Sequence, residues 1–152
     1  MTKKNNYAIT SNIKNFIMNT NKLYLTPING IIGYNHLMKQ DAPKRSINSD
    51  TAYYLLLSDL DAICNALNKH LQVELSENKL CALISYFYNN HKIPTPLTLA
   101  EVNTGKLKLA GELLFLGRLA KEIRAIRAQE YKLWNDDKLA ILSLKPSEYM
   151  FL

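Results

Sequence analysis

The sequence predicts an α+β fold in which a small antiparallel β region stands beside a helix-rich body. Strand-forming residues separated by turn residues gather between positions 22 and 37, and most of the chain after residue 48 follows the helical period. The 152 residues suit one domain, and the five glycines and five prolines mark a few breaks instead of a linker. A two-part shape of this kind commonly leaves a cleft, where a ligand is expected.

The N-terminal part is expected to contain one short helix and the β region. The helix is predicted from Asn12 to about Thr20, and Ser11 or Asn12 can accept hydrogen bonds from its first N–H groups. In the next stretch the alternation of strand formers and turn residues predicts a hairpin-like antiparallel patch. Its strand formers are Leu23, Tyr24, Ile28, Ile31, Ile32 and Tyr34.

The strongest helical pattern runs from Ser49 to about His70. Apolar residues recur there at three- and four-residue intervals, which predicts one buried face. These residues are Tyr53, Leu56, Leu57, Leu60, Ile63, Cys64 and Leu67, with Leu71 beyond the end. Ser76 opens the next predicted helix, which ends at the pair Asn89-Asn90.

The remaining chain is expected to be helical as well. A short helix is predicted over Thr98 to Asn103, and Gly105 precedes a long helical stretch from about Lys108 to Trp134, with a possible break near Gly117. Residues 135–152 are interpreted as an appended C-terminal arm.

The composition excludes several classes of protein. Cys64 and Cys81 are too few and too far apart for a disulfide scaffold or a zinc ribbon, and we expect both to be small buried apolar residues. His70 and His91 are too far apart for a metal motif, so neither a metal nor another cofactor is expected. No apolar run approaches the roughly 20 residues of a membrane-spanning helix, and no secretory signal is visible at the start.

The net charge is +6, from 19 Lys and Arg against 13 Asp and Glu. It favours anionic partners such as cell-wall polymer, phospholipid headgroups or nucleic acid, and selects none of them. Four cations at three-residue steps, Arg118, Lys121, Arg124 and Arg127, predict a basic stripe on the long helical stretch. This stripe is either a solvated face or an interaction surface for acidic polymer, a partner protein or phosphate.

Several short motifs, taken in order, resemble one enzyme family. They are Ile13-Lys14, Leu23-Tyr24, Pro27, Gly30 to His36, Ile47 to Ala52, Leu75 to Tyr86, Asn103-Thr104-Gly105, and Ile123 to Trp134. Over residues 13–134 this order resembles the phage-type lysozymes, glycoside hydrolase family 24. The resemblance implies a lysozyme-like domain over residues 1–134, with 135–152 as an extension, and a role linked to peptidoglycan.

The resemblance also implies that the catalytic residues have been lost. The family's acid falls on Ile17, whether it is counted from Ile13 or from Pro27, and its second acidic residue falls on Thr26. A threonine of the family falls on Ile31. Glycoside hydrolysis needs a proton donor and an opposing acidic group, and none of these three side chains supplies either.

No displaced carboxylate is expected to take their place. Residues 1–40 contain no Asp or Glu, and the nearest acids in sequence are Asp41 and Asp50. The acids farther along are interpreted as residues of helix surfaces or ends, without a catalytic role. They include Asp59, Asp61, Glu74 and Glu77.

Other positions of the resemblance carry expectations about binding. His36 matches the family histidine and is expected to form structural hydrogen bonds. Asn89 matches a cleft asparagine, so it either binds a sugar group or makes local backbone bonds. Asn35 replaces a glycine and tolerates a positive φ, whereas His91 replaces another glycine and leaves its turn in doubt.

The leading hypothesis is therefore an inactive lysozyme-like protein, a pseudoenzyme that binds peptidoglycan or a protein partner. The alternative is a weak or altered muramidase. Nucleic acid binding is not expected, because no element that reads bases is recognisable. The chain is expected to be encoded by a phage or to act in the bacterial cytoplasm or envelope, and the sequence selects neither a compartment nor an oligomeric state.

Overall fold

The computed structural model describes residues 5–116 and 124–136. Its first helix, α1, spans Ser11–Thr20. Thr10 lies in extended backbone before the helix, and its side chain accepts a hydrogen bond from the Ile13 N–H. The helix cap is thus Thr10, one residue before the expected positions, and it satisfies one of the free N–H groups of the first turn.

A three-stranded antiparallel sheet follows, in the order β1-β2-β3. The strands are β1 (Tyr24–Ile28), β2 (Ile31–Gly33) and β3 (His36–Leu37). Ile28 pairs with Ile31, so Asn29 and Gly30 form a two-residue turn. Their φ angles of +49° and +80° are those of the turn that matches the twist of a hairpin. The structure confirms the predicted β region.

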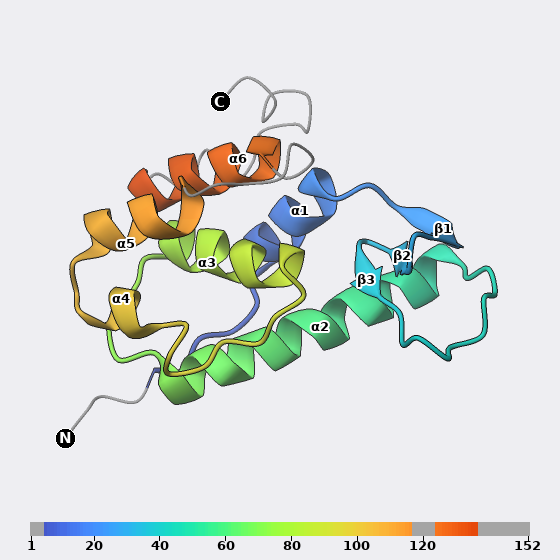
Figure 1. Cartoon of the computed structure of the whole chain (residues 1–152), viewed down its shortest axis with the longest axis horizontal. Coiled ribbons are helices and arrows are strands. Elements are labelled where there is room, and N and C mark those ends of the chain that lie inside the picture. The colour runs from blue at the N-terminus through green and yellow to red at the C-terminus, as the bar shows by residue number, and fades with distance from the viewer. Residues whose placement is uncertain (1–4, 117–123, 137–152) are drawn as a thin grey trace.

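The longest helix, α2 (Ser49–His70), runs from the sheet to the helical body, as Figure 1 shows. Asn48 caps it by accepting a hydrogen bond from the Thr51 N–H at 2.8 Å. Asp50 lies in its first turn and Lys69 in its last turn, and these charges interact favourably with the helix dipole. Both predicted ends of this helix are confirmed.

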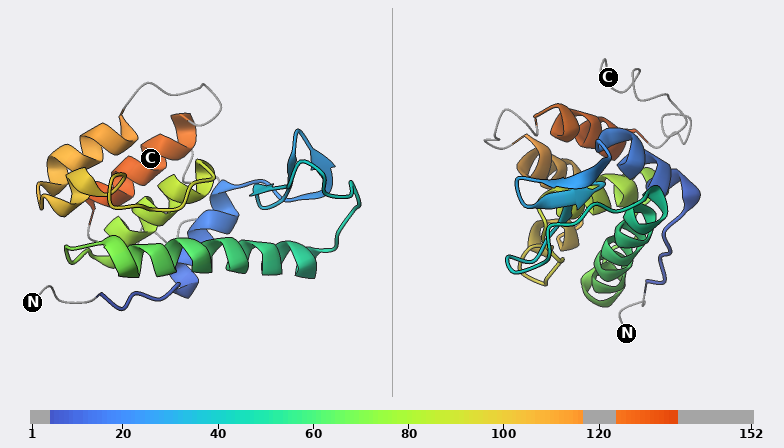
Figure 2. Two further views of the ribbon diagram at one scale, coloured as in Figure 1. Left: turned by 60° about the horizontal axis from the view of Figure 1, so that its bottom comes forward. Right: turned by 90° about the vertical axis from the view of Figure 1, so that its right-hand side faces the viewer.

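The helical body contains α3 (Glu77–Asn89), α4 (Ala100–Asn103), α5 (Leu107–Phe115) and α6 (Arg124–Asn135). Ser76 caps α3, as its position predicted. Helix α3 is buried along most of its length because α1, α2 and α6 pack around it (Figure 2). The core that they share includes Phe16, Leu56, Leu60, Leu83, Phe87 and Trp134.

The expected long stretch from Lys108 to Trp134 is two helices. Helix α5 ends at Phe115 and α6 begins at Arg124, and the predicted break at Gly117 lies outside the described residues. The two helices pack against each other, and the Trp134 indole donates a hydrogen bond to the Leu107 carbonyl at 2.7 Å. A Cβ on Gly111 would clash with the Trp134 ring, so the close approach of α5 and α6 depends on this glycine.

An N-terminal strap, residues 5–9, crosses the far end of α2. The Asn5 side chain donates to the Leu71 carbonyl at 2.8 Å, and the Tyr7 N–H donates to the Asn68 side chain. The Tyr7 hydroxyl accepts from the Leu75 N–H at 2.8 Å. These bonds fix the segment that leads into α1.

The two cysteines are free and buried, as expected. Burial raises the pKa of the Cys81 thiol well above its usual range, so this side chain is an uncharged apolar residue of the core. Within the described part of the chain, no helix combines the length and the apolar character needed to cross a bilayer.

Candidate functional site

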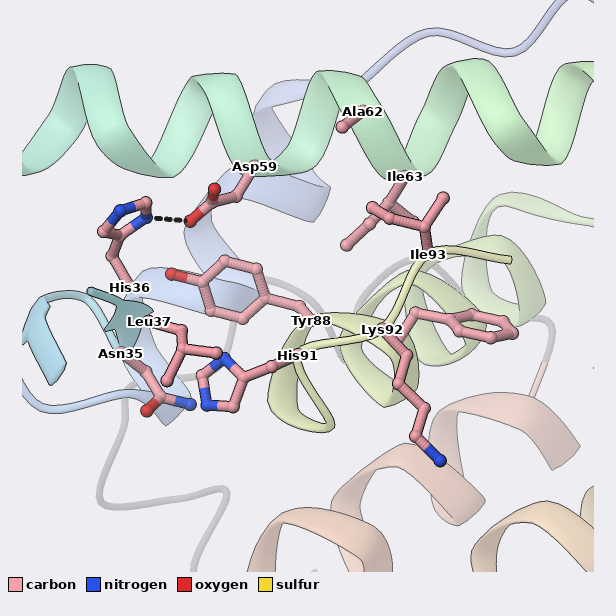
Figure 3. A pocket seen from close by; sticks show the side chains of 11 residues that line it. Asn35, His36, Leu37, Asp59, Ala62, Ile63, Tyr88, His91, Lys92 and Ile93 are labelled. Carbon is pink, nitrogen blue, oxygen red and sulfur yellow. Dashed lines mark hydrogen bonds and ion pairs between the residues drawn. The ribbon is translucent and has the colours of Figure 1, made fainter. Parts of the chain in front are cut away.

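A pocket of about 140 Å³ lies where the sheet, α2 and the end of α3 meet (Figure 3). Three separate segments of the chain form its walls. Its lining residues are Asn35, His36, Leu37, Asp59, Ala62, Ile63, Phe87, Tyr88, His91, Lys92 and Ile93. The pocket therefore occupies the junction between the two parts of the fold, where a ligand cleft was expected.

The side chains of His36 and Asp59 form a hydrogen bond across this junction. Nδ1 of His36 lies 2.7 Å from Oδ2 of Asp59, and the side chains are 27% and 31% exposed. The pair fixes β3 to the middle of α2. The expected structural hydrogen bond of His36 is confirmed, and its partner is Asp59, an acid of α2 for which the sequence predicted no specific partner.

The sequence carried a signal for Asp59. It lies three residues after Leu56 and four before Ile63, so it falls on the apolar face of α2. An acid on the buried face of a helix requires a partner, because an unpaired buried charge is costly. The partner is 23 positions away and on a strand, so helical spacing does not identify it.

Tyr88 holds the sheet from the opposite side of the pocket. Its hydroxyl donates a hydrogen bond to the Tyr34 carbonyl. Burial raises the pKa of the Tyr88 phenol well above its usual range, and the charge of Asp59 raises it further. The phenol therefore remains a hydrogen-bond donor at any physiological pH.

His91 completes this wall in an unusual backbone conformation. Its φ of +54° is left-handed, where glycine is most at ease. The turn survives nevertheless, because the Lys92 N–H donates to the Phe87 carbonyl at 3.1 Å. Burial lowers the pKa of the imidazole; the charge of Asp59 raises that pKa, and His36 lowers it. The ring is therefore mainly neutral at neutral pH.

Asn89 and Asn35 connect the pocket to the interior of α3. The Asn89 amide donates to the Ser85 carbonyl at 3.0 Å and to its hydroxyl at 3.1 Å. Its Oδ1 accepts from the Asn35 amide at 3.3 Å. Asn89 thus makes the local bonds that were one of its two expected roles, and sugar binding by Asn89 and His36 remains a prediction.

The three positions that motif spacing assigned to the family's catalytic residues do not line this pocket. Ile17 is 0% exposed and belongs to the apolar core, in the last turn of α1. Thr26 is exposed on β1, and Ile31 is half-buried on β2. One of the residues that line the pocket is an acid, Asp59, and its carboxylate is hydrogen-bonded to the His36 imidazole.

The expected basic stripe is corrected at Arg127. This side chain is 1% exposed, and it pairs with Glu130 and lies over the Tyr86 ring, 4.5 Å from its centroid. Arg127 lies seven residues before Trp134, so the two residues share the buried face of α6. The three-residue spacing of the basic residues did not indicate this face. Arg118 and Lys121 lie outside the described residues, as does the Arg124 side chain.

Glu130, which the sequence analysis did not single out, is buried at 0% exposure beside Arg127. Burial raises the pKa of its carboxyl to about 7, whereas Arg127 and hydrogen bonds from Ser85 and Asn89 lower it. The sequence signal for this pair was the spacing, because an acid three residues after an arginine can pair with it on a helix. Among the described residues, no three histidine, cysteine or acidic side chains converge as metal ligands.

Comparison with known proteins identifies the family. A sequence profile of phage lysozymes matches residues 19–116, which is well over half of the chain. This chain belongs to the phage lysozyme family. The match begins just after Ile17, so the position expected for the acid rests on motif spacing.

Individual relatives agree with this family assignment. An endolysin of Bacillus phage PZA is 29% identical over 106 residues, which cover 68% of this chain and 34% of the endolysin. The matching region thus spans about a third of that relative. Two solved structures show the lysozyme-like fold at 20% identity, and each match covers 86% of this chain. The muramidase domain of SpmX from Asticaccaulis excentricus matches over 99% of its length with a TM-score of 0.69, and a variant of P22 lysozyme matches over 100% with a TM-score of 0.65.

Proposed function

We propose that this member of the phage lysozyme family is a pseudoenzyme that binds the glycan strands of peptidoglycan without cleaving them. The observation that carries the proposal is the complete burial of Ile17 in the apolar core. Motif spacing assigns this position to the acid that protonates the leaving oxygen. An isoleucine in the core stabilises the fold, and its side chain has no proton to transfer.

The chemistry of hydrolysis supports this proposal. A glycosidase needs two carboxyl groups flanking the scissile bond, one as acid and one as base or nucleophile. Thr26, at the second position, carries a hydroxyl that stays neutral and cannot oppose the positive charge of the transition state. Loss of general acid catalysis alone removes about 10²- to 10⁴-fold in rate, or about 3 to 5 kcal/mol of barrier.

The pocket supplies groups that suit a sugar. The Asn35 amide and the neutral His91 ring offer hydrogen bonds to hydroxyl and acetamido groups, while Leu37 and Ile93 form an apolar rim that is about half exposed. Apolar walls with a few placed polar groups are typical of small-molecule sites. Holding a glycan requires only these contacts, so it does not depend on the lost acids.

Binding is tested by co-sedimentation with purified peptidoglycan sacculi. We expect the natural chain to sediment with sacculi, and Leu37→Asp to reduce the affinity about tenfold, because a charge would replace the apolar rim. Leu97→Asp is the matched control, since Leu97 is 85% exposed and does not line the pocket. Retention of the natural chain by a cell lysate but not by sacculi would instead favour a protein partner.

Hydrolysis is tested separately by the clearing of a cell-wall suspension. We expect no clearing by the natural chain. Any clearing by the natural chain would establish the rival function, an altered muramidase. Loss of that clearing in Asp59→Asn or Glu130→Gln would show that the substituted acid is required for it. The double variant Ile17→Glu with Thr26→Asp shows whether the lost groups suffice to restore cleavage.

A further inference from the structure

Helix α5 and its C-terminal cap carry exposed leucines that none of the described elements covers. Leu109 and Leu113 are 45% and 54% exposed and lie one turn apart on one side of the helix, and Leu116, the C-cap residue, is 56% exposed. The opposite side, with Ala110, Gly111 and Phe115, is buried. We call these three exposed residues the leucine stripe.

Two lysines accompany the leucine stripe. Lys106 is the N-cap residue of α5, and Lys108 lies in the first turn of the helix; both are exposed. They share a surface hollow with Leu107, Leu109 and the half-buried Glu112, the single acid of α5. Cations thus outnumber acids around the stripe, on a chain whose net charge is already +6.

The stripe is small, and its size argues against a protein partner. A helix of nine residues is about 13 Å long and about 10 Å wide, so the exposed face covers on the order of 130 Å². A stable protein interface needs about 800 Å² on each partner. A lipid surface has no such minimum, because apolar side chains enter the acyl boundary singly while lysines remain among the phosphates.

We propose that α5 is a membrane-contact helix, which inserts the leucine stripe into an anionic phospholipid surface with Lys106 and Lys108 at the headgroups. Helix α5 lies at the outer edge of the helical body, at the end away from the sheet (Figure 1). Contact through this edge leaves the pocket beside the sheet uncovered. The inference does not depend on what the pocket binds.

The test uses the full chain and lipid vesicles in a sedimentation assay. We expect binding to phosphatidylcholine vesicles that contain roughly one third phosphatidylglycerol, and little binding to phosphatidylcholine alone, with affinity falling as salt is added. Leu113→Gln should weaken binding about tenfold. Lys106→Gln with Lys108→Gln should weaken it about 25-fold, at about fivefold for each lysine.

Two matched controls separate this surface from general charge and exposure. Leu97→Gln changes a leucine that is 85% exposed outside α5, and Lys132→Gln changes an exposed lysine on α6; both should bind vesicles like the natural chain. Thermal melting confirms that every variant is folded. Equal binding to neutral and anionic vesicles, or equal losses in the controls, would overturn the proposal.

A second readout places the helix at the lipid. Leu113→Trp adds an exposed indole to a chain whose own tryptophan, Trp134, is buried. Its emission should shift to the blue when anionic vesicles are added. An unchanged emission would contradict membrane contact. A leucine-stripe variant that alters the mass of the free protein in sedimentation velocity would also contradict it, and would assign the stripe to self-association.

Discussion

At position 17, which motif spacing assigns to the family's acid, the side chain is an isoleucine of the apolar core. Ile17 is packed among apolar residues, and its backbone carbonyl accepts hydrogen bonds from the Asn21 N–H at 3.1 Å and from the Asn21 amide at 3.0 Å. A carboxyl group in the same place would need a hydrogen-bond partner or would lose solvation. The chain therefore gains apolar burial where the family's spacing expects an acid.

This exchange predicts that Ile17→Glu lowers the stability of the protein. The substitution removes the burial of an isoleucine and buries a carboxyl, so we expect a loss of at least about 3 kcal/mol in the free energy of unfolding. Urea denaturation measures it. Ile17→Val is the control and should cost about 0.5 to 1.5 kcal/mol. An Ile17→Glu variant as stable as the natural chain would contradict the interpretation of this position as core.

Glu130 predicts a pH dependence of stability. Its pKa is raised to about 7 from a usual value of 4.5, so between these values the folded state binds a proton that the unfolded chain releases. Its contribution to the unfolding free energy is complete below pH 4.5 and is lost as the pH rises through about 7. The expected loss is on the order of 2 to 3 kcal/mol.

Urea melts from pH 4.5 to pH 8 measure this effect. Glu130→Gln keeps the side chain neutral, so its stability curve should be flatter over this interval, even if the variant is less stable throughout because Arg127 loses its partner. If the stability curves of the natural chain and of the variant were parallel, Glu130 would not titrate in this pH range.

At the scale of elements, the helical period and the caps predicted most of the fold. Ser76 caps the helix that it was expected to open, and the apolar spacing predicted both ends of α2. For the stretch after Lys108 the sequence predicted one long helix with a possible break near Gly117, and the structure has two helices there, α5 and α6. Gly117 lies outside the described residues, so the position of the break stays a prediction.

The α5–α6 contact predicts the effect of Gly111→Ala. Alanine favours a helix over glycine by about 1 kcal/mol, but the new methyl group would clash with the Trp134 ring. Overpacking a core costs about 1 to 3 kcal/mol, so we expect a lower melting temperature. Trp134→Phe makes room, and the double variant should lose less stability than the sum of the two single variants. If the losses of stability of the two single variants simply added in the double variant, the strain would not lie at the contact between residue 111 and Trp134.

At the scale of the whole molecule, the pocket depends on residues that only the fold brings together. The sequence identified His36 and His91 through family motifs, but it did not connect His36 with Asp59, because no local spacing joins a strand to the middle of α2. Arg127 was misplaced for a related reason, since the buried face of α6 is defined by its neighbours α3 and α5. Elements are encoded locally, whereas partners across elements are not.

The His36–Asp59 pair predicts how the two parts of the fold are held together. Asp59→Asn removes the charge that fixes β3 to α2, and for a partly exposed pair we expect a loss of about 1 kcal/mol. Native-state hydrogen exchange should show faster exchange in residues 24–37, while α6 keeps its protection. Tyr54→Asn is the control, because Tyr54 is an exposed residue of α2. Equal acceleration in both regions would mean that the pair stabilises the molecule as a unit.

The N-terminal strap has a consequence for the newborn polypeptide. Tyr7 leaves the ribosome long before Asn68 and Leu75, the residues that bind it. At typical translation speeds of 5 to 20 residues per second, roughly 3 to 14 seconds separate the two events. During that interval the apolar residues of α1 have no surface to pack on, so a chaperone that binds nascent chains would contact α1 before α2 and α3 are made.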